Sequence, residues 1–512
     1  MPKQNHKAMK NTSIKIILLF PLCLFFSRCD VLDQEPVSVV EVSTFYDSPS
    51  AAEIGLVGCY NRFFQETGYS RLIMYLQTST DDIKQPSGFG FQLKDRTQLT
   101  ANPASGGGYD VAWKQMYETL ANVNFLIEQV ALIPDQEFVD PNNFPNRNRK
   151  AEILAEGHFL RGITYYYLTL TWRDVPLILE FPEGGPEDNY VAKSSQTEIL
   201  AQVKEDLEIA ERDLPDVLDN YLDANPTNQR KGKASKWAAK AYLARIALWE
   251  EDWQKALDLS NEIINSSQYT FTPNWVDMFI HPMNASESIF EQQNDFSPGF
   301  FGSGFFGWFF GYDFEWTESA LELYEKPDTI GITQGKDVRF DNSYAPHPWG
   351  ETANLARKHV PPEGFEAGGV ESMNFVIIRL TELYFNKAEA LNELNYEGNK
   401  EEVLNILNMM RTRTRDEDFV NRWFSTAPVG TTGIPPLTLA DVDTQEKMRQ
   451  VIRDEKRREM MWEDGIRWID LLRWDKAYAM QITNADSEDK LYLPIHTDEI
   501  LRNPMLEQNP AY

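Results

Sequence analysis

The chain has 512 residues, of which 78 are Asp or Glu and 49 are Lys or Arg, and its formal net charge is −29. So acidic a protein repels phosphate backbones and anionic lipid surfaces, which argues against nucleic acid as a partner. The hydrophobic fraction of 42% indicates a folded globular body, organised as one large domain with several lobes or as two closely packed domains.

The first 28 residues have the composition of a lipoprotein signal peptide. Four lysines precede an apolar run at 16–26, which is shorter than the roughly 20 residues that span a bilayer as a helix. Cys29 follows directly and resembles the cysteine of a bacterial lipobox, although Arg28 departs from the small residue usual before it. We therefore expect cleavage before Cys29, an acyl chain such as palmitate on its thiol, and a lipid-anchored position on the outer membrane facing the exterior. An ordinary signal peptide with an incidental cysteine is the alternative, and Cys23 is a weaker lipidation site.

Apolar residues recur at the helical period of 3.6 along most of the chain. The expected helices cover residues 51–64, 109–131, 151–171, 195–214, 235–250, 253–264, 377–394, 400–415 and 445–474. The fourth of them opens with a capping box formed by Ser195 and Glu198. The short turn before residue 253 joins two helices with small alanines on one face, which is the tetratricopeptide design. The sequence therefore predicts a mostly α fold with about four helix pairs and a long final helix.

Three long irregular insertions interrupt these helices, at 78–108, 270–372 and 415–444. Within the second, residues 287–293 alternate like a strand and predict a small β element. Loops longer than roughly 15 residues in a compact protein are usually functional or disordered. We therefore expect the ligand chemistry to lie on these long irregular loops and not on the helices.

The segment 298–316 is the first candidate ligand-binding loop, because about half of it is aromatic and five glycines make it a poor helix or strand. Trp308, Tyr312 and Trp316 offer flat faces that suit the apolar faces of pyranose rings. Trp349, in a His-Pro-Trp-Gly sequence, is a further contributor. The alternative is that these rings pack inward and hold a glycine-rich loop in place.

Residues 80–96 form the second candidate loop. Asp81 and Asp82 can accept sugar hydroxyl protons, and Arg96 can donate hydrogen bonds. Phe89 and Phe91 add aromatic faces to this predicted site. A capped turn held by a salt bridge explains the same charged residues equally well.

The stretch 452–474 is dense in charges at spacings that allow ion pairs between residues three or four positions apart. Trp462, Trp468 and Leu472 supply its apolar faces. We interpret this stretch as an ion-paired core helix that pins the C-terminus, and we expect no catalytic role for its carboxylates.

Six phrases in a fixed order carry a resemblance to a known family. They lie at 155–178, 232–253, 377–394, 407–414, 452–474 and 491–512, behind the lipobox. The chain resembles the SusD/RagB nutrient-binding outer-membrane lipoproteins. The resemblance implies a SusD-like α-helical fold, with an N-terminal region at 29–270 and a C-terminal region at 271–512 that carries the ligand loops. It also implies a protein that catalyses nothing, captures an oligosaccharide and delivers it to a SusC-like TonB-dependent barrel in the outer membrane.

The residues leave three other functions open. The same role can serve a peptide or another nutrient, and a tetratricopeptide scaffold would bind proteins on its concave helix faces. A hydrolase would need two carboxylates at a suitable distance, which 78 acids always allow. No Gly-x-Ser-x-Gly, Walker, His-Glu-x-x-His or Cys-x-x-Cys motif occurs, and the six histidines show no metal-ligand spacing. We therefore expect neither an enzyme nor a cofactor.

Overall fold

The computed structural model describes most of the chain after residue 44. The described residues are 45–84, 94–101, 109–139, 148–182, 184, 190–216, 231–273, 275, 277–280, 284–293, 315–325, 337–346, 354–356, 358, 374–414 and 435–512. Tyr46–Tyr512 forms one compact unit. The predicted signal peptide and Cys29 lie outside the described residues. None of the helices in the described part is both long enough and apolar enough to cross a membrane.

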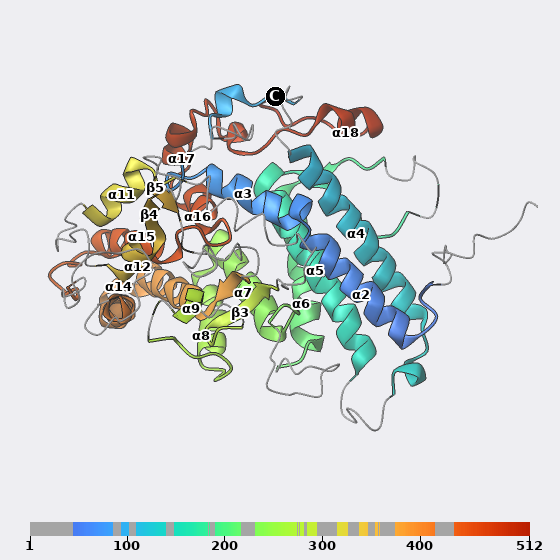
Figure 1. Ribbon diagram of the computed structural model, residues 1–512, viewed down its shortest axis with the longest axis horizontal. Coiled ribbons are helices and arrows are strands. Elements are labelled where there is room, and N and C mark those ends of the chain that lie inside the picture. The colour runs from blue at the N-terminus through green and yellow to red at the C-terminus, as the bar shows by residue number, and fades with distance from the viewer. Residues whose placement is uncertain are drawn as a thin grey trace, which may run out of the picture. The chain divides into compact units, whose positions relative to one another are not determined.

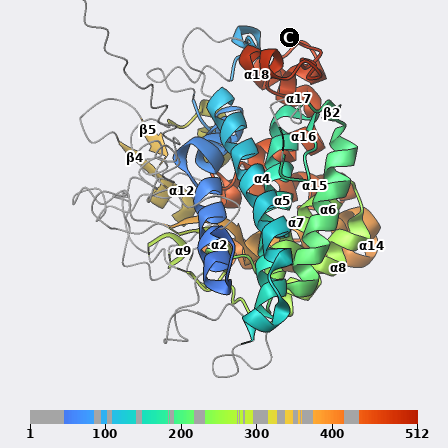
Figure 2. The same ribbon diagram turned by 90° about the vertical axis from the view of Figure 1, so that its right-hand side faces the viewer.

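A series of long helices forms the frame of the compact unit and confirms the mostly α fold class (Figure 1). These helices are α2 (Pro49–Phe63), α4 (Tyr109–Leu132), α5 (Arg149–Trp172), α6 (Gln196–Asp213), α7 (Lys236–Trp249), α8 (Trp253–Ile264) and α14 (Leu380–Arg413). Each of them packs against the next one in this order. Figure 2 shows α2, α4, α5 and α6 standing side by side. The predicted helices before residue 270 are confirmed, and each of their ends lies within two residues of the predicted position.

Polar caps define where these helices begin. The predicted capping box is present, since the Glu198 amide donates to the Ser195 hydroxyl oxygen and the Ser195 amide donates to the Glu198 carboxylate. Asp252 accepts from the amide of Lys255 and so starts α8 at Trp253, with only three residues between it and the end of α7 at Trp249. The predicted turn between these two helices is therefore confirmed.

The helix predicted from residue 377 begins later than expected. Phe375–Arg379 is strand β6, which pairs antiparallel with β3 (Ser288–Gln292), and all ten residues of the two strands are buried. Its β-branched sequence Phe-Val-Ile-Ile-Arg favours a fully buried strand over a helical turn. The α14 helix then runs to Arg413 through a non-helical Asn395, so the expected pair at 377–394 and 400–415 is two helices joined by a kink. The strand predicted at 287–293 is confirmed.

The remaining elements are short. They are η1 (Glu66–Ser70), α3 (Arg71–Thr78), η2 (Arg96–Gln98), η3 (Asp135–Phe138), α9 (Asp277–Ile280), α11 (Glu318–Glu325), α12 (Val338–Ser343), α17 (Lys476–Thr483), η6 (Glu488–Leu491) and α18 (Thr497–Arg502). Two further antiparallel pairs join β1 (Val175–Pro176) to β2 (Lys193–Ser194) and β4 (Tyr344–Pro346) to β5 (Asn354–Ala356).

The prediction of one helix over 445–474 is wrong. The chain forms α15 (Gln445–Met460) and α16 (Ile466–Trp474), separated by a turn in which Trp462, Asp464 and Gly465 have positive φ. Gly465 lies so close to α3 that a Cβ there would be 2.6 Å from the Cβ of Leu76. The turn points Glu463 and Asp464 into the interior, where they are 1% and 0% exposed.

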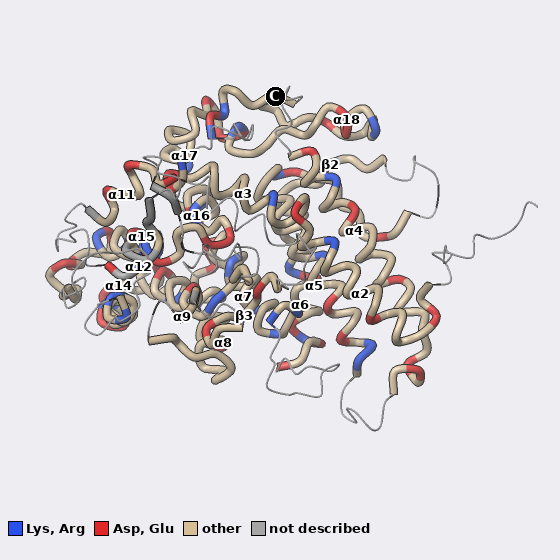
Figure 3. The backbone as a smooth tube through the Cα atoms, viewed as in Figure 1, with Lys and Arg blue, Asp and Glu red and all other residues tan. Residues whose placement is uncertain are grey.

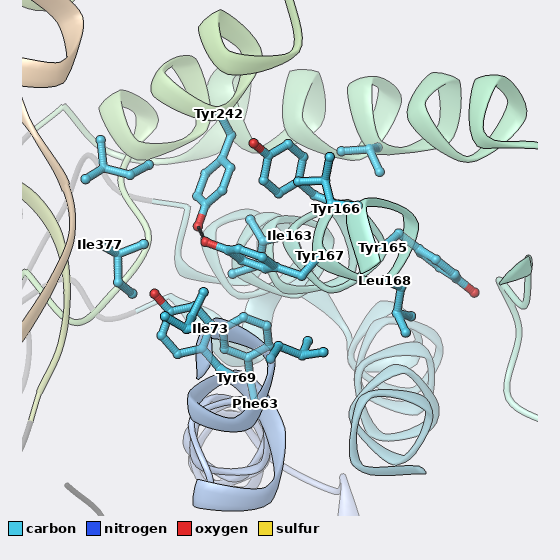
Figure 4. Packing of buried hydrophobic residues seen from close by; sticks show 14 of the residues in the cluster. Phe63, Tyr69, Ile73, Ile163, Tyr165, Tyr166, Tyr167, Leu168, Tyr242 and Ile377 are labelled. Atoms are coloured by element: carbon cyan, nitrogen blue, oxygen red, sulfur yellow. Dashed lines mark hydrogen bonds between the residues drawn. The ribbon is translucent and has the colours of Figure 1, made fainter. Parts of the chain in front are cut away.

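A cluster of tyrosines fills the centre of the core beside this turn (Figure 4). The hydroxyls of Tyr167 and Tyr242 are 2.9 Å apart, and Tyr69 packs edge-on against the Tyr167 ring. Tyr69 and Tyr167 both donate hydrogen bonds to Asp464. The turn between α15 and α16 is thereby held by η1 through Tyr69 and by α5 through Tyr167, and Arg245 of α7 also donates to Asp464.

Candidate functional site

The two predicted ligand loops share one base. Ile83, near the start of the 80–96 loop, forms an antiparallel β-bridge with Trp316, at the end of the 298–316 loop. The Lys84 amide donates to the Glu315 carbonyl oxygen at 2.8 Å, and the Thr317 amide donates to the Asp82 carbonyl oxygen at 3.2 Å. Segments more than 200 residues apart in the sequence therefore meet at one point.

The segment that contains Trp349, the third predicted contributor, begins close to the same bridge. The indole N–H of Trp316 donates to the carbonyl oxygen of Ser343, which immediately precedes β4. The β4 and β5 strands pair at either end of the segment 347–353, which contains Trp349. We call Ile83, Lys84, Glu315, Trp316 and Ser343 the loop base, because one end of each candidate loop is held there.

Trp316 itself is a core residue of the loop base. It is 1% exposed, and its ring meets Trp462 edge to face with centroids 4.5 Å apart. Phe340 and Tyr324 pack on it at 5.3 and 5.7 Å. This placement agrees with the alternative in which the ring packs inward and holds the loop.

Asp81 and Asp82 are also buried, and protein side chains bind both oxygens of the Asp81 carboxylate and one oxygen of the Asp82 carboxylate. Arg467 makes two hydrogen bonds to Asp81, at 2.9 and 3.0 Å, and the Tyr478 hydroxyl donates a third at 2.8 Å. Arg457 donates to Asp82 at 2.7 Å. Burial raises the pKa of Asp81, but Arg457 and Arg467 outweigh it and hold this pKa well below its usual range. The salt-bridged turn, the alternative for these residues, is the arrangement that the geometry supports.

Arg96 lies 2% exposed beneath the same loop. Its guanidinium donates to the Ser79 hydroxyl oxygen at 2.7 Å and stacks over the Trp468 ring at 5.4 Å. Burial lowers the pKa of Arg96 to about 10. No salt bridge joins it to a carboxylate among the described residues.

Of the predicted ligand residues, the structure thus brings Asp81, Asp82 and Trp316 together, with Arg96 on the same loop, and makes them supports of the loops. Phe89, Phe91, Trp308, Tyr312 and Trp349 lie outside the described residues, so their binding roles stay predictions. At the loop base, the pair that reaches the surface is Lys84 and Glu315, whose charged groups are 3.3 Å apart and whose side chains are 55% and 37% exposed.

A network of buried charged residues joins α15 and the turn after it to residues near the second and third insertions, 270–372 and 415–444. Glu455 and Glu459 of α15 and Glu463 of the following turn are its acids. Their partners are Arg339 of α12, Lys358, Arg379 of β6, and Arg411 and Arg413 at the end of α14. These basic residues flank the segments 326–336, 347–373 and 415–434. The predicted ion-paired stretch is confirmed, but most of its pairs reach across the fold and not along one helix.

The geometry of the network is dense enough to keep its acids ionised. Arg379 contacts Glu463 at 2.7 Å and Glu459 at 3.0 Å, and Arg413 contacts Glu459 at 2.5 Å. Burial raises the pKa of Glu455, but Arg339, Arg411 and Arg458 lower it to about 2. Burial lowers the pKa of Lys358 to about 8, although its ammonium donates to Glu463 and to two carbonyl oxygens.

Sequence reasoning missed the partners that position the loops. Arg457, Arg467 and Tyr478 were not assigned to the 80–96 loop, because nothing in their local sequence indicates a contact with residues nearly 400 positions earlier. Acidic and basic residues are interspersed along the helices (Figure 3), so charge pattern alone does not select the pairs. Among the described residues, no group of three His, Cys, Asp or Glu side chains is placed to hold a metal ion.

Two family models match the chain. The model described as SusD family matches residues 330–485, and the one described as starch-binding associating with outer membrane matches residues 32–248. The chain is 24% identical to SusD-like protein P38 of Formosa agariphila, across 99% of this chain and 100% of that protein. A SusD-like protein of Bacteroides ovatus is 23% identical, across 73% of this chain and 71% of that protein.

Solved structures have the same fold. A laminarin-binding SusD-like protein superposes with a TM-score of 0.69 at 20% identity, covering 91% of this chain and 100% of the other. A SusD superfamily protein from Bacteroides vulgatus gives a TM-score of 0.67 at 20% identity, covering 92% of this chain and 100% of the other.

Proposed function

Because the chain belongs to the SusD family, we propose that it binds a glycan at the loops of the loop base and passes it to a transporter in the outer membrane. The observation that carries the proposal is the shared origin, at Ile83, Trp316 and Ser343, of three loops that contain the predicted aromatic ligand residues. Loops that start from one rigid point can present their rings to one ligand, and aromatic faces suit sugar rings.

The rigidity of the base supports a binding site that is formed before the ligand arrives. Asp81 alone ties together α15, α16 and α17 through Arg457, Arg467 and Tyr478. A site held in place by such buried contacts loses little conformational entropy when the ligand binds. The described part of the site therefore serves as the support, and the predicted aromatic residues of the loops would make the contacts.

The electrostatics favour binding over hydrolysis. A glycosidase needs one carboxylic acid whose pKa is raised and which reaches the substrate. The carboxylates of Asp81, Glu455 and Glu459 instead have pKa values held down by arginines. Burial raises the pKa of Asp82, Asp454 and Asp464. Of these, however, Asp82 and Asp464 are 0% exposed, and Asp454 accepts a hydrogen bond from Gln450 of its own helix. We infer a protein that binds and does not cleave.

Glucans are the first ligands to test, because one family model is described as starch-binding and one structural neighbour as laminarin-binding. Isothermal titration of the mature chain with maltohexaose and laminarihexaose should give saturable heat with at least one of them. Trp308→Ala and Tyr312→Ala should weaken that binding about tenfold or more. Phe138→Ala, in η3 and away from the loop base, is the control and should bind normally. Saturable heat with peptides and none with glycans would replace the sugar by a peptide ligand.

The anchor and the transporter belong to the same proposal. Cys29→Ala expressed in the native host should lose acyl labelling and leave the outer-membrane fraction. A TonB-dependent barrel should co-purify with the lipidated protein after mild detergent extraction. Membrane attachment of the Cys29→Ala chain would remove the proposed anchor, and a protein purified without a barrel would remove the proposed partner.

A further inference from the structure

A surface cavity of about 400 Å³ lies on elements other than those of the loop base. Three segments distant in sequence form its walls: α4, the chain from β1 to Pro182, and the C-terminal residues from α18 to Leu506. In Figure 1, α4 and α18 lie apart from α11, β4 and β5, which are next to the loop base along the chain. Its volume falls in the range of small-molecule sites, roughly 300–1,000 Å³.

The walls of the cavity are mainly aromatic and aliphatic. Trp113 and Tyr117 of α4 lie with ring centroids 4.9 Å apart, and Trp113 meets Trp172 edge to face at 5.2 Å. The Tyr117 hydroxyl donates to the Pro176 carbonyl oxygen at 2.9 Å, which fixes its ring in the wall. Leu506 closes the C-terminal side of the cavity. Rigid rings of this kind bury the apolar face of a ligand at little entropic cost.

The Trp113 indole N–H makes no hydrogen bond to the described part of the chain. Trp113 is 4% exposed and lines the cavity. The equally buried Trp172 and Trp275 donate their indole N–H groups to the Pro494 carbonyl oxygen and to Glu459. The Trp113 Nε1 is not among the fully buried unpartnered atoms, so this donor is open to a water or to a ligand oxygen in the cavity.

The rim adds charged groups that recognise hydroxyls. Glu499 and Arg502 of α18 line the cavity, and their charged groups are 2.6 Å apart. The carboxylate accepts hydroxyl protons, and the Arg502 side chain is 65% exposed and has donors to spare. Since the two charges cancel, the rim favours a neutral ligand over an ion.

We propose that this cavity is a second glycan subsite, which takes one neutral sugar ring or a disaccharide, with an apolar face on Trp113 and Tyr117 and hydroxyls on the rim. A ring with one apolar face, an acceptor for the indole and several hydroxyls matches all three features of the walls. The choice of a sugar rests on the proposed function; the position of the site rests on the cavity itself. A second subsite on the same molecule would raise the avidity of the protein for a long glycan.

The test fills the cavity without touching the core. Ala121 lines the cavity on α4, whereas Ala131 on the same helix is exposed and outside it, so Ala121→Trp and Ala131→Trp are a matched pair. Maltose and laminaribiose serve as probes, with binding to the mature chain followed by ligand-observed NMR titration. We expect Ala121→Trp to weaken binding of a disaccharide about tenfold or more, and Ala131→Trp to leave it unchanged. Thermal unfolding of both variants confirms that they fold.

A rim variant and the loop variants separate this site from the loops. Glu499→Gln, on the partly exposed rim, should weaken disaccharide binding as well, while hexasaccharide binding that depends on Trp308 and Tyr312 persists in Ala121→Trp. Unchanged disaccharide binding in Ala121→Trp would overturn the second site and leave the proposed function intact. Loss of disaccharide binding in Ala121→Trp together with normal binding in the loop variants would support the second site and remove the loops as the binding site. Absence of binding by every glycan in the wild-type chain would overturn both.

Discussion

Arg467 in α16 makes two parallel hydrogen bonds to Asp81, at 2.9 and 3.0 Å, and so ties the C-terminal helices to the start of a loop near the N-terminus. The Asp81 side chain is 4% exposed and that of Arg467 is 12% exposed. Because both groups are largely buried, water cannot solvate either charge well enough to replace its partner. The contact therefore closes the loop base as firmly as a core packing contact does.

We expect Asp81→Ala to lower the free energy of unfolding by about 3–5 kcal/mol, because it leaves two arginines facing a buried gap. Denaturant unfolding of the mature chain measures this loss. The matched control is Asp486→Ala, which removes a surface pair with Lys490 in which the aspartate is 70% exposed, and it should cost less than about 1 kcal/mol. Equal losses in the two variants would contradict the structural role of the Asp81 pair.

Gly465 offers a second test, of the turn between α15 and α16. Its φ is +67°, and an added Cβ would lie 2.6 Å from Leu76, so Gly465→Ala combines backbone strain with a collision in the core. We expect a loss of about 2 kcal/mol or more in unfolding free energy. Gly58→Ala in α2 is the control, because nothing lies within 4 Å of a Cβ there, and it should be neutral or stabilise by up to about 1 kcal/mol. A Gly465→Ala protein as stable as the wild type would show that the turn is differently placed.

The helices could be predicted because their signals are local. The capping box at Ser195, the cap at Asp252 and the period of apolar residues each lie within one or two turns of the chain. The break at Gly465 could not be predicted, since charged and apolar residues continue at helical spacing through the turn. Gly465 has a positive φ and leaves no room for a side chain against Leu76 of α3, a contact that only the folded chain reveals.

The candidate site could be predicted as loops but not as individual contacts. Sequence composition identified the 80–96 and 298–316 segments, and the bridge between Ile83 and Trp316 shows that they leave the frame together. The roles of Asp81 and Trp316 depend on distant partners, Arg467 and Trp462, which no spacing rule connects to them. The aromatic cavity at Trp113 was missed because its walls come from three separate parts of the chain.

Glu455 leads to a prediction about acid stability. Arg339, Arg411 and Arg458 overcome burial and lower the pKa of Glu455 to about 2, from an ordinary value of 4.5. The contribution of this carboxylate to stability is therefore complete above pH 4.5 and is lost as the pH falls towards 2, by on the order of 3 kcal/mol. We expect Glu455→Gln to be much less stable than the wild type at pH 7, with the difference shrinking below pH 4. Thermal unfolding across pH 3–7 measures this, and a difference independent of pH would contradict it.

Asp464 should show the opposite dependence on pH. Burial raises its pKa to about 6, from an ordinary value of 3.8, and outweighs the lowering by Arg245, which gives two of its nitrogens to Glu382 and one to Asp464. The folded protein therefore holds this proton more tightly than the unfolded chain does, and the contribution of Asp464 to stability falls as the pH rises from about 4 to 6. An asparagine at this position still accepts the hydroxyl protons of Tyr69 and Tyr167 and has no such titration. We expect the unfolding free energy of Asp464→Asn, relative to the wild type, to increase by on the order of 3 kcal/mol between pH 4 and pH 7. Asp464→Asn and Glu455→Gln are measured in the same buffers, so that each is the control for the other. If the stability of Asp464→Asn relative to the wild type stays flat or falls over this range, Arg245 keeps the Asp464 carboxylate ionised throughout.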